Sequence, residues 1–261
     1  MQRLGSEFAK PQALEQVSVA FAGPVDEAGN VLAAPTIWGT RLAAPHPLLR
    51  DLRETWPGAG VTLMNDVTAA GYRYLTPSSR DFCIVTVSSG IGQKVFLSGR
   101  PVVGKDGSGG ELGHLQVDDS PGAPTCECGG RGHVGALASG RGVLQQARLA
   151  VGKAQLTSAE LVSAFHRGEP WAVEAVGGGA AQLGFALASL HLGVGLTRFV
   201  LFGGFALALG EPYRALVARA AAVRCWDGRG DWNGWVELGV NDDDAGLIGA
   251  GLALAREEGA R

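Results

Sequence analysis

The chain has 261 residues, enough for one large domain or two modest ones with a sizeable core. Apolar residues make up 46% and charged residues 18%, which excludes a disordered chain, and a net charge of −3 without a long basic run argues against nucleic acid as the main partner. Four cysteines, two of them close together, and no charged-then-apolar leader indicate a cytoplasmic protein rather than an exported one with disulfides.

The N-terminal part of the chain alternates between helix-like and strand-like segments. Residues 1–16 predict a short polar helix, and residues 17–22 form an apolar run of strand length that ends in a turn-rich segment. A helix over residues 47–56 and a strand over residues 61–64 follow. This alternation predicts an α/β protein.

Asn65 and Asp66 come directly after the second of these strands, just before a further helix. A carboxylate in this position lies at the carboxyl edge of a sheet, where α/β proteins place their active sites. Asp66 is therefore a candidate catalytic group. It is also a candidate helix N-cap, a role that Asp often fills, and this stretch alone favours the cap.

A glycine-rich loop, Ser88-Ser-Gly-Ile-Gly, follows a predicted buried strand over residues 81–88 and leads into the next strand. Such loops present backbone N–H groups to phosphates, and Ser89, Gly90 and Gly92 are the candidates. A β-hairpin turn explains the same pattern equally well.

The richest stretch is residues 107–140, GSGGELGHLQVDDSPGAPTCECGGRGHVGALASG. His114, Cys126, Cys128 and His133 supply four ligands of the types that a tetrahedral zinc site uses, and the glycines between them allow tight turns. A closed four-ligand site leaves no position for substrate, so we expect a structural metal. The alternative is two reduced cysteines and two solvated histidines. Glu127, between the cysteines, is expected to be solvated.

The C-terminal half predicts helices around one more strand. A helix over residues 143–149 is followed by one that Thr157 and Glu160 open as a capping box. A long helix over residues 174–191 ends at Gly193 and Gly195, and a strand from Arg198 enters a glycine turn. This apolar region contains polar residues throughout and predicts a buried helix and strand, not a membrane span. The segment from Asp242 is rich in small residues.

Together, Gly-Gly-Glu-Leu-Gly-His and the Cys-x-Cys-Gly-x-x-Gly segment resemble the signature of the ROK family, bacterial sugar kinases and sugar-responsive repressors. The resemblance covers residues 17–255, and it implies that the segment from Asp242 is a closing helix whose small residues allow close packing. It implies that Asp66 is the general base and that Asn65, Glu111 and His114 hold the sugar, His114 also being a zinc ligand. The glycine-rich loop then binds phosphates, and Gly203 and Gly204 lie under the adenosine of ATP, which brings Mg²⁺.

Four departures from the family pattern concern the site. His133 stands where the family usually has Cys, an exchange that zinc accepts. Gly135 replaces a sugar-contacting Glu, Thr36 replaces an Asn, and Ser88 replaces the first Gly of the phosphate loop. Gly135, Thr36 and Ser88 each make a glucose-kinase assignment less secure.

Two N-terminal features of the family are not found in the sequence. The first is the Asp-x-Gly-Gly-Thr segment that handles ATP phosphates. A start at an internal Met, strands supplied from elsewhere, or lost phosphoryl transfer each explain this. The second is the DNA-binding helix-turn-helix of the repressors.

The resemblance implies an α/β fold of the actin-like ATPase (ribonuclease H-like) class, in two lobes with a sugar cleft between them. Residues 1–66 with the helix 245–261 form a truncated small lobe, and residues 67–244 form the large lobe with the zinc loop. The leading hypothesis is an ATP-dependent kinase of a hexose or hexosamine. The alternative is a non-catalytic sugar-binding or scaffold protein on the same fold. Family members are often dimers, so a homodimer is expected.

Overall fold

The computed structural model describes residues 14–38, 42–104, 107, 109–226, 230–240 and 244–259. They divide into two compact units. Unit 1 comprises Met1–Pro77, Pro101–Gly109 and Asp242–Arg261, and unit 2 comprises Ser78–Arg100 and Gly110–Asn241. Most of the predicted N-terminal helix lies outside the described residues, and its last residue, Gln16, begins a strand instead.

Unit 1 is built on two parallel strands, β1 (Gln16–Phe21) and β2 (Gly60–Asn65), as the two apolar runs predicted. Within the described residues these strands form a two-stranded sheet. The connection between them carries the helices α2 (Pro35–Trp38) and α3 (Leu48–Thr55). Apolar side chains of the strands, the connection and α3 form one core, which includes Phe21, Val31, Leu48, Leu52 and Val61.

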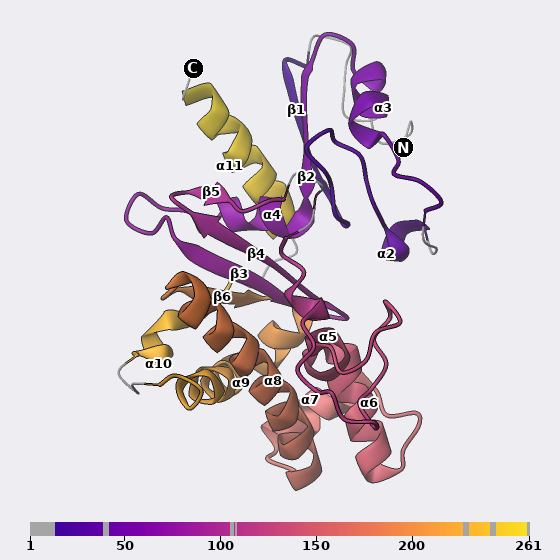
Figure 1. Ribbon diagram of the computed structural model, residues 1–261, viewed down its shortest axis with the longest axis vertical. Coiled ribbons are helices and arrows are strands. Elements are labelled where there is room, and N and C mark those ends of the chain that lie inside the picture. Colours follow the sequence, from indigo (N-terminus) through magenta and orange to yellow (C-terminus); the bar gives the residue numbers. More distant parts are fainter. Residues whose placement is uncertain are drawn as a thin grey trace. The chain divides into compact units, whose positions relative to one another are not determined.

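Two helices complete unit 1, α4 (Asp66–Tyr72) and α11 (Ala245–Gly259). They pack against each other, and α11 also contacts β1 (Figure 1). A Cβ atom added to Gly249 would lie 1.8 Å from the carbonyl oxygen of Ala69, so only glycine allows this approach. The predicted close packing of the small-residue helix is thus confirmed.

Unit 2 contains a five-stranded sheet in the order β5-β4-β3-β6-β7. Its strands are β3 (Phe82–Val87), β4 (Ile91–Leu97), β5 (Arg100–Pro101), β6 (Phe199–Phe202) and β7 (Val236–Leu238). β3 pairs antiparallel with β4 and parallel with β6, which in turn pairs parallel with β7. Alternate residues Cys83, Val85 and Val87 of β3 enter the main core, as the period of a strand requires.

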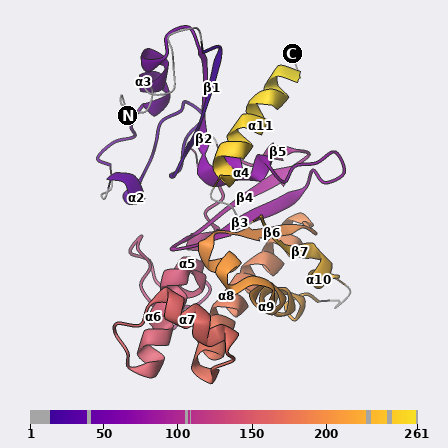
Figure 2. The same cartoon turned by 180° about the vertical axis from the view of Figure 1, so that it is seen from behind.

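Helices cover the core face of this sheet (Figures 1 and 2). They are α5 (Val134–Ala138), α6 (Gly140–Val151), α7 (Ser158–His166), α8 (Pro170–Val194), α9 (Gly204–Ala222) and the short α10 (Trp232–Trp235). α8 packs against α5, α6, α7 and α9, and its Val176, Leu183 and Leu187 are fully buried. By length and composition alone α8 could cross a membrane, but here it is a core helix.

The ends of α8 differ from the prediction. The helix starts at Pro170, four residues early, because proline is favoured in the first turn, where its missing N–H is not needed. Gly193 continues the helix, and Gly195 ends it with φ of 80°. Of the two glycines, only the one in the left-handed conformation stops the helix.

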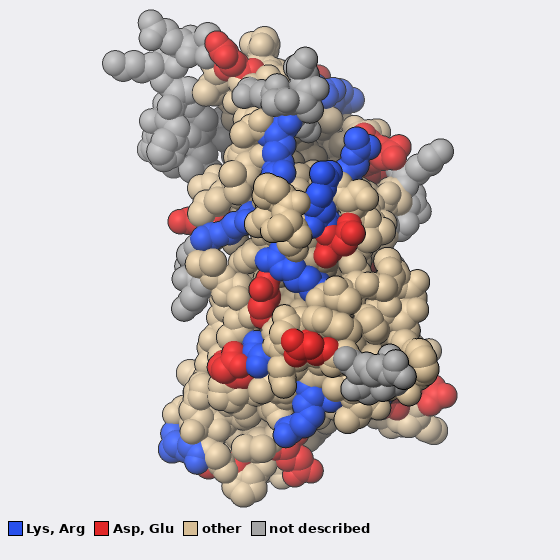
Figure 3. Space-filling view, turned by 90° about the vertical axis from the view of Figure 1, so that its left-hand side faces the viewer, with Lys and Arg blue, Asp and Glu red and all other residues tan. Residues whose placement is uncertain are grey.

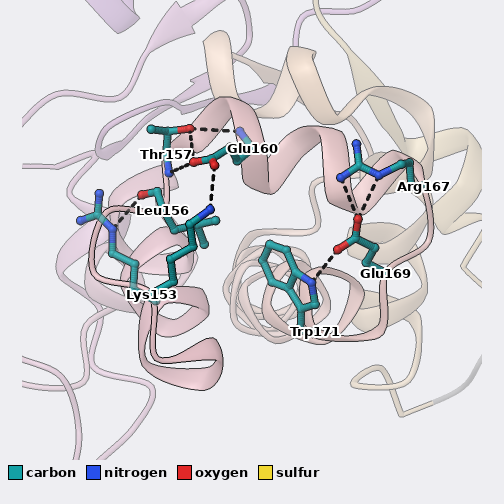
Figure 4. A network of polar contacts seen from close by, with 8 residues as sticks. Lys153, Leu156, Thr157, Glu160, Arg167, Glu169 and Trp171 are labelled. Carbon is teal, nitrogen blue, oxygen red and sulfur yellow. Dashed lines mark hydrogen bonds and ion pairs between the residues drawn. The ribbon is translucent and has the colours of Figure 1, made fainter.

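The predicted capping box of α7 is confirmed (Figure 4). Thr157 Oγ1 accepts the backbone N–H of Glu160 at 3.2 Å, and the Glu160 carboxylate accepts the N–H of Thr157 at 2.8 Å. Lys153 Nζ donates to the same carboxylate at 2.8 Å. The bond from Lys153, followed by those from Thr157, lowers the pKa of Glu160 to about 2.

α9 was not predicted, because Gly210-Glu-Pro interrupts its sequence. The helix is kinked there, with Gly210 at φ 66° and ψ −153°. Pro212 has no N–H to give to the carbonyl of Ala208 four residues earlier. His166 Nε2, at the end of α7, lies 2.9 Å from that oxygen and takes the place of the missing donor.

The surface charge is mixed. On the face shown in Figure 3, Lys and Arg side chains are interleaved with Asp and Glu, and no broad area of one sign stands out. This face shows no basic surface of the kind that nucleic acid requires.

Candidate functional site

Asn65 and Asp66 lie at the carboxyl end of β2, where the strand turns into α4. Asn65, not Asp66, is the N-cap: its Oδ1 accepts the N–H groups of Val67 at 3.0 Å and Thr68 at 3.1 Å. Its Nδ2 donates to the carbonyl of Gly23 and to Oδ1 of Asp66, both at 3.0 Å. The cap interpretation of Asp66 was therefore wrong, and Asn65 holds the neighbouring carboxylate in place.

The Asp66 carboxyl is half-buried. Burial raises its pKa above the ordinary value, although hydrogen bonds from Val67, its own backbone and Asn65 act in the opposite direction. The contacts from Asn65 and Val67 both reach Oδ1. Oδ2 accepts no bond from Asn65 or Val67, so it keeps a lone pair that can take a proton. A raised pKa makes the ionised carboxylate a stronger base.

In unit 2 the four predicted metal ligands lie together, with all four ligand atoms within 4.8 Å of one another. Cys126 Sγ is 3.7 Å from His114 Nδ1, and Cys128 Sγ is 3.3 Å from His133 Nδ1. Atoms that share one tetrahedral zinc lie roughly 3.3–3.8 Å apart, given the usual Zn–S and Zn–N distances. Two thiolates and two imidazoles at these separations are a donor set that suits zinc. The four side chains lie together as a shared metal site requires, and the zinc itself stays a prediction.

Backbone hydrogen bonds hold this cluster in a frame of glycines. Cys126 N–H donates to the carbonyl of Gly130 at 2.7 Å, and Val117 N–H donates to that of Gly132 at 2.8 Å. A Cβ on Gly130 would lie 2.6 Å from His133 Nε2, and one on Gly132 would lie 1.6 Å from the carbonyl oxygen of Asp118. Any side chain at these positions would displace His133 or the backbone at Asp118.

Glu111 and His114 lie at the two ends of one short turn, since His114 closes the 3₁₀ helix Leu112–His114 that Glu111 begins. His114 Nε2 is 3.9 Å from Glu111 Oε2, while its Nδ1 faces Cys126. With a metal on Nδ1 the proton of the imidazole stays on Nε2, facing the carboxylate. The pair would then present an N–H donor and a carboxylate acceptor side by side.

Lys94 on β4 was missed by the sequence analysis. It is a buried cation, 5% exposed, and a Cβ on Gly110 would lie 2.7 Å from its Nζ. Burial lowers the pKa of Lys94, and the negative charge of Glu111 raises it in part. The only signal in the sequence is a lysine inside an apolar strand. Its charge balances that of Glu111.

The glycine segments converge at the carboxyl ends of β3 and β6. The Ser88–Gly92 loop is the β3–β4 hairpin turn, with Val87 opposite Ile91. Gly203 has φ of 94°, and a Cβ there would lie 2.6 Å from Thr86 Oγ1 on β3. Gly204 starts α9, and no side chain caps that helix. The N–H groups of its first turn therefore face outward at the positive end of the helix, where anions bind.

Phe205, which follows Gly204, belongs to the core of unit 2. It is 7% exposed, and its ring packs against Gly140 and Tyr213 as part of the core. Gly135 stands where the family has a sugar-contacting Glu. Its backbone lies close to that of Gly113, which leaves little space for a side chain. A Cβ there would lie 3.0 Å from the carbonyl oxygen of Gly113.

Glu127 is not simply solvated, contrary to the prediction. Its carboxylate pairs with Arg141 Nη1, in the first turn of α6. Arg141 Nε also donates to the carbonyl of Ser89 at 2.8 Å. The sequence analysis missed Arg141, because nothing in the local pattern connects it with either partner.

Comparison with known proteins agrees with these features. Residues 4–258 match the ROK family. A C(7)-cyclitol 7-kinase of Streptomyces hygroscopicus subsp. limoneus is 40% identical over 264 residues, covering 93% of this chain and 74% of that protein. An N-acetylmannosamine kinase of Citrobacter koseri is 37% identical over 138 residues, covering 51% of this chain and 46% of that protein.

Among solved structures, the ROK hexokinase from Thermus thermophilus has a TM-score of 0.76 at 31% identity, covering 94% of this chain and 80% of that one. This likeness confirms the predicted α/β fold of the actin-like ATPase class.

Proposed function

The chain belongs to the ROK family, and on that basis we propose that it is an ATP-dependent kinase that phosphorylates a hydroxyl group of a sugar or of a closely related polyhydroxylated ring. One observation carries the proposal. Asp66 is fixed at the end of β2, with a pKa that burial raises and an oxygen left available to take a proton. Phosphoryl transfer asks the protein for a placed base and for charge stabilisation, and for little else.

Asp66 takes the proton of the attacking hydroxyl, and Asn65 holds the carboxylate in position for it. Glu111 accepts hydrogen bonds from ring hydroxyls, and the Nε2–H of His114 donates one. Support comes from the side-by-side placement of these two groups and from the buried Lys94 nearby, whose pKa the charge of Glu111 raises in part. Zinc held by His114, Cys126, Cys128 and His133 fixes this loop and takes no part in the reaction.

ATP, with its Mg²⁺, binds to the glycine segments of unit 2. Ser89, Gly90 and Gly92 contact the phosphates, and Gly203 and Gly204 lie against the adenosine. The uncapped first turn of α9 and the close approach of Gly203 to β3 support this assignment. We place the protein in the cytoplasm, where ATP is available, and expect a homodimer.

Two classes of acceptor compete. Hexoses and hexosamines fit the family pattern and the similarity to an N-acetylmannosamine kinase and a hexokinase. A C7-cyclitol fits the 40% identity to a cyclitol kinase over most of the chain. We therefore rank a cyclitol as a full second candidate.

The test is ADP release by the purified chain with Mg²⁺ and ATP, against a panel of hexoses, hexosamines and C7-cyclitols. Turnover of any one of them that Asp66→Asn abolishes supports the kinase. Ring binding without turnover for every member of the panel would instead support the non-catalytic sugar-binding alternative. Neither binding nor turnover would contradict both.

A further inference from the structure

The Ser88–Gly92 loop, Gly203 and Gly204 form a glycine-lined edge of unit 2. Among the residues described so far at this edge, only Arg141 carries a full positive charge. It stands in the first turn of α6, a twelve-residue helix whose N-terminus abuts the glycine-rich loop. The backbone N–H of Gly140 donates to the carbonyl of Ser88 at 2.8 Å. Ser139 caps the helix through the N–H of Gly142 at 3.1 Å. The backbone before and after Arg141 is therefore fixed relative to the loop.

The guanidinium is held from two sides. Nε donates to the Ser89 carbonyl at 2.8 Å, and Nη1 pairs with Glu127. Nη2 lies 4.0 Å from the position that a Cβ on Gly90 would take, so it faces the glycine of the loop. No described residue accepts a hydrogen bond from Nη2. A guanidinium has five N–H donors, and this arrangement leaves several of them for a ligand.

Both members of the ion pair are accessible, since 53% of the Arg141 side chain and 65% of the Glu127 side chain are exposed. An exposed pair of this kind adds little to stability. A planar guanidinium is, however, well suited to phosphate, because its fork matches two phosphate oxygens at once. Arg141 is thus placed and oriented beyond what stability alone accounts for.

We propose that Arg141 is a nucleotide-binding residue whose guanidinium contacts the phosphates of ATP over Gly90, with Glu127 orienting it from the metal-binding loop. This rests on the proposed function, because it assigns the nucleotide to the same glycine segments. It adds to them a charged side chain that the glycine pattern does not contain. It also gives Glu127, the residue between Cys126 and Cys128, a role in nucleotide binding.

The experiment compares the affinity of the zinc-loaded protein for a non-hydrolysable ATP analogue and for adenosine, by calorimetry. Arg141→Met should weaken analogue binding about ten- to hundredfold, the usual effect of losing hydrogen bonds to a charged partner, and leave adenosine binding unchanged. Arg141→Lys keeps the charge but loses the fork, so it should restore part of the affinity.

Arg148→Met is the matched control. Arg148 lies on the same helix, and its Nε donates to a single carbonyl, that of Leu156, at 2.9 Å. Its loss should change neither affinity. If Arg141→Met weakened the binding of the analogue and of adenosine equally, Arg141 would have a structural role and the inference would be overturned. A variant that binds the analogue as tightly as wild type would also overturn it.

The proposed function fails in a different way. If wild-type protein binds the analogue but turns over no acceptor, the kinase assignment fails while the role of Arg141 is still decided by the variants. If wild-type protein binds no nucleotide, both are overturned.

Discussion

His166 Nε2 donates a hydrogen bond to the carbonyl oxygen of Ala208 across 2.9 Å, at the kink that Gly210 and Pro212 put into α9. The two residues stand on different helices, so this contact joins α7 to the break in its neighbour. Both are exposed, and water can replace the histidine at the carbonyl.

The kink in α9 predicts that replacing Gly210 lowers the free energy of unfolding more than replacing His166 does. Gly210→Ala should lower the free energy of unfolding by about 1–3 kcal/mol, because φ 66° with ψ −153° is a region that only glycine occupies readily. The cost comes from the backbone, since a Cβ there would meet only Pro212, at 4.0 Å. His166→Ala should cost about 0.5 kcal/mol. Chemical denaturation measures both, and a larger loss from His166→Ala would contradict this ranking.

The α11–α4 contact predicts opposite effects at two glycines of one helix. Gly249→Ala should destabilise the protein by about 1–3 kcal/mol, because the methyl group would lie 1.8 Å from the Ala69 carbonyl oxygen. Gly251 has open space around its Cβ position, so Gly251→Ala should be neutral or stabilise by up to about 1 kcal/mol through helix propensity. Comparing the thermal unfolding of the two variants distinguishes the effect of helix packing from that of helix propensity. Similar effects of both changes would argue against tight packing of these helices.

The metal cluster predicts that zinc content and stability fall together. Wild-type protein should contain close to one zinc per chain, and Cys126→Ser should lower both the zinc content and the melting temperature. Cys225→Ser, at a cysteine outside the cluster, should change neither. Elemental analysis and a thermal melt measure the two quantities. A metal-free wild type with the same melting temperature would remove the zinc assignment.

Asp66→Asn should abolish turnover and leave ring binding largely intact, without loss of stability. The asparagine Oδ1 can still accept the bonds from Asn65 and Val67. Because the folded-state pKa of Asp66 is raised, its contribution to stability is greatest below its unfolded pKa and is lost as pH rises through the folded one. At neutral pH the ionised carboxylate therefore costs stability, and the variant should melt at the same or a higher temperature. A clear drop would mean that the ionised carboxylate stabilises the fold.

The same raised pKa sets the pH dependence of turnover. As pH falls, kcat should decline through the pKa of Asp66, at a higher pH than an ordinary aspartate would give. The profile should be recorded with saturating acceptor, so that kcat reports the bound state. A decline that begins only at the ordinary pKa of aspartate would show that Asp66 is not desolvated in the active protein.

Features encoded in a few consecutive residues could be predicted from the sequence. The capping box at Thr157, the strand that ends in Asn65 and the His/Cys cluster each follow from spacing of a few residues and from ligand chemistry. The roles of Asn65 and Asp66 were harder to separate. Either side chain can cap a helix, and the choice between them depends on backbone angles that the sequence does not show.

Features that depend on contacts between distant segments could not be predicted. Glu127 meets Arg141, and Lys94 is buried beside Gly110, only because the loop after β5 returns to the sheet. α9 was missed because glycine and proline interrupt it, and its continuation past the kink depends on packing against α8. In such places tertiary contacts override the local pattern.

The arrangement of unit 1 from three separate stretches has a consequence for biosynthesis. β1 is made before any strand of unit 2, whereas α11, which packs against β1 and α4, is made after all of them. Unit 2 has all its strands once β7 has been made. During translation, therefore, the unit with the His/Cys cluster and the glycine segments has its strands available first. The unit with Asp66 gains α11 only after those strands have been made, so its packing around β1 and α4 is completed later.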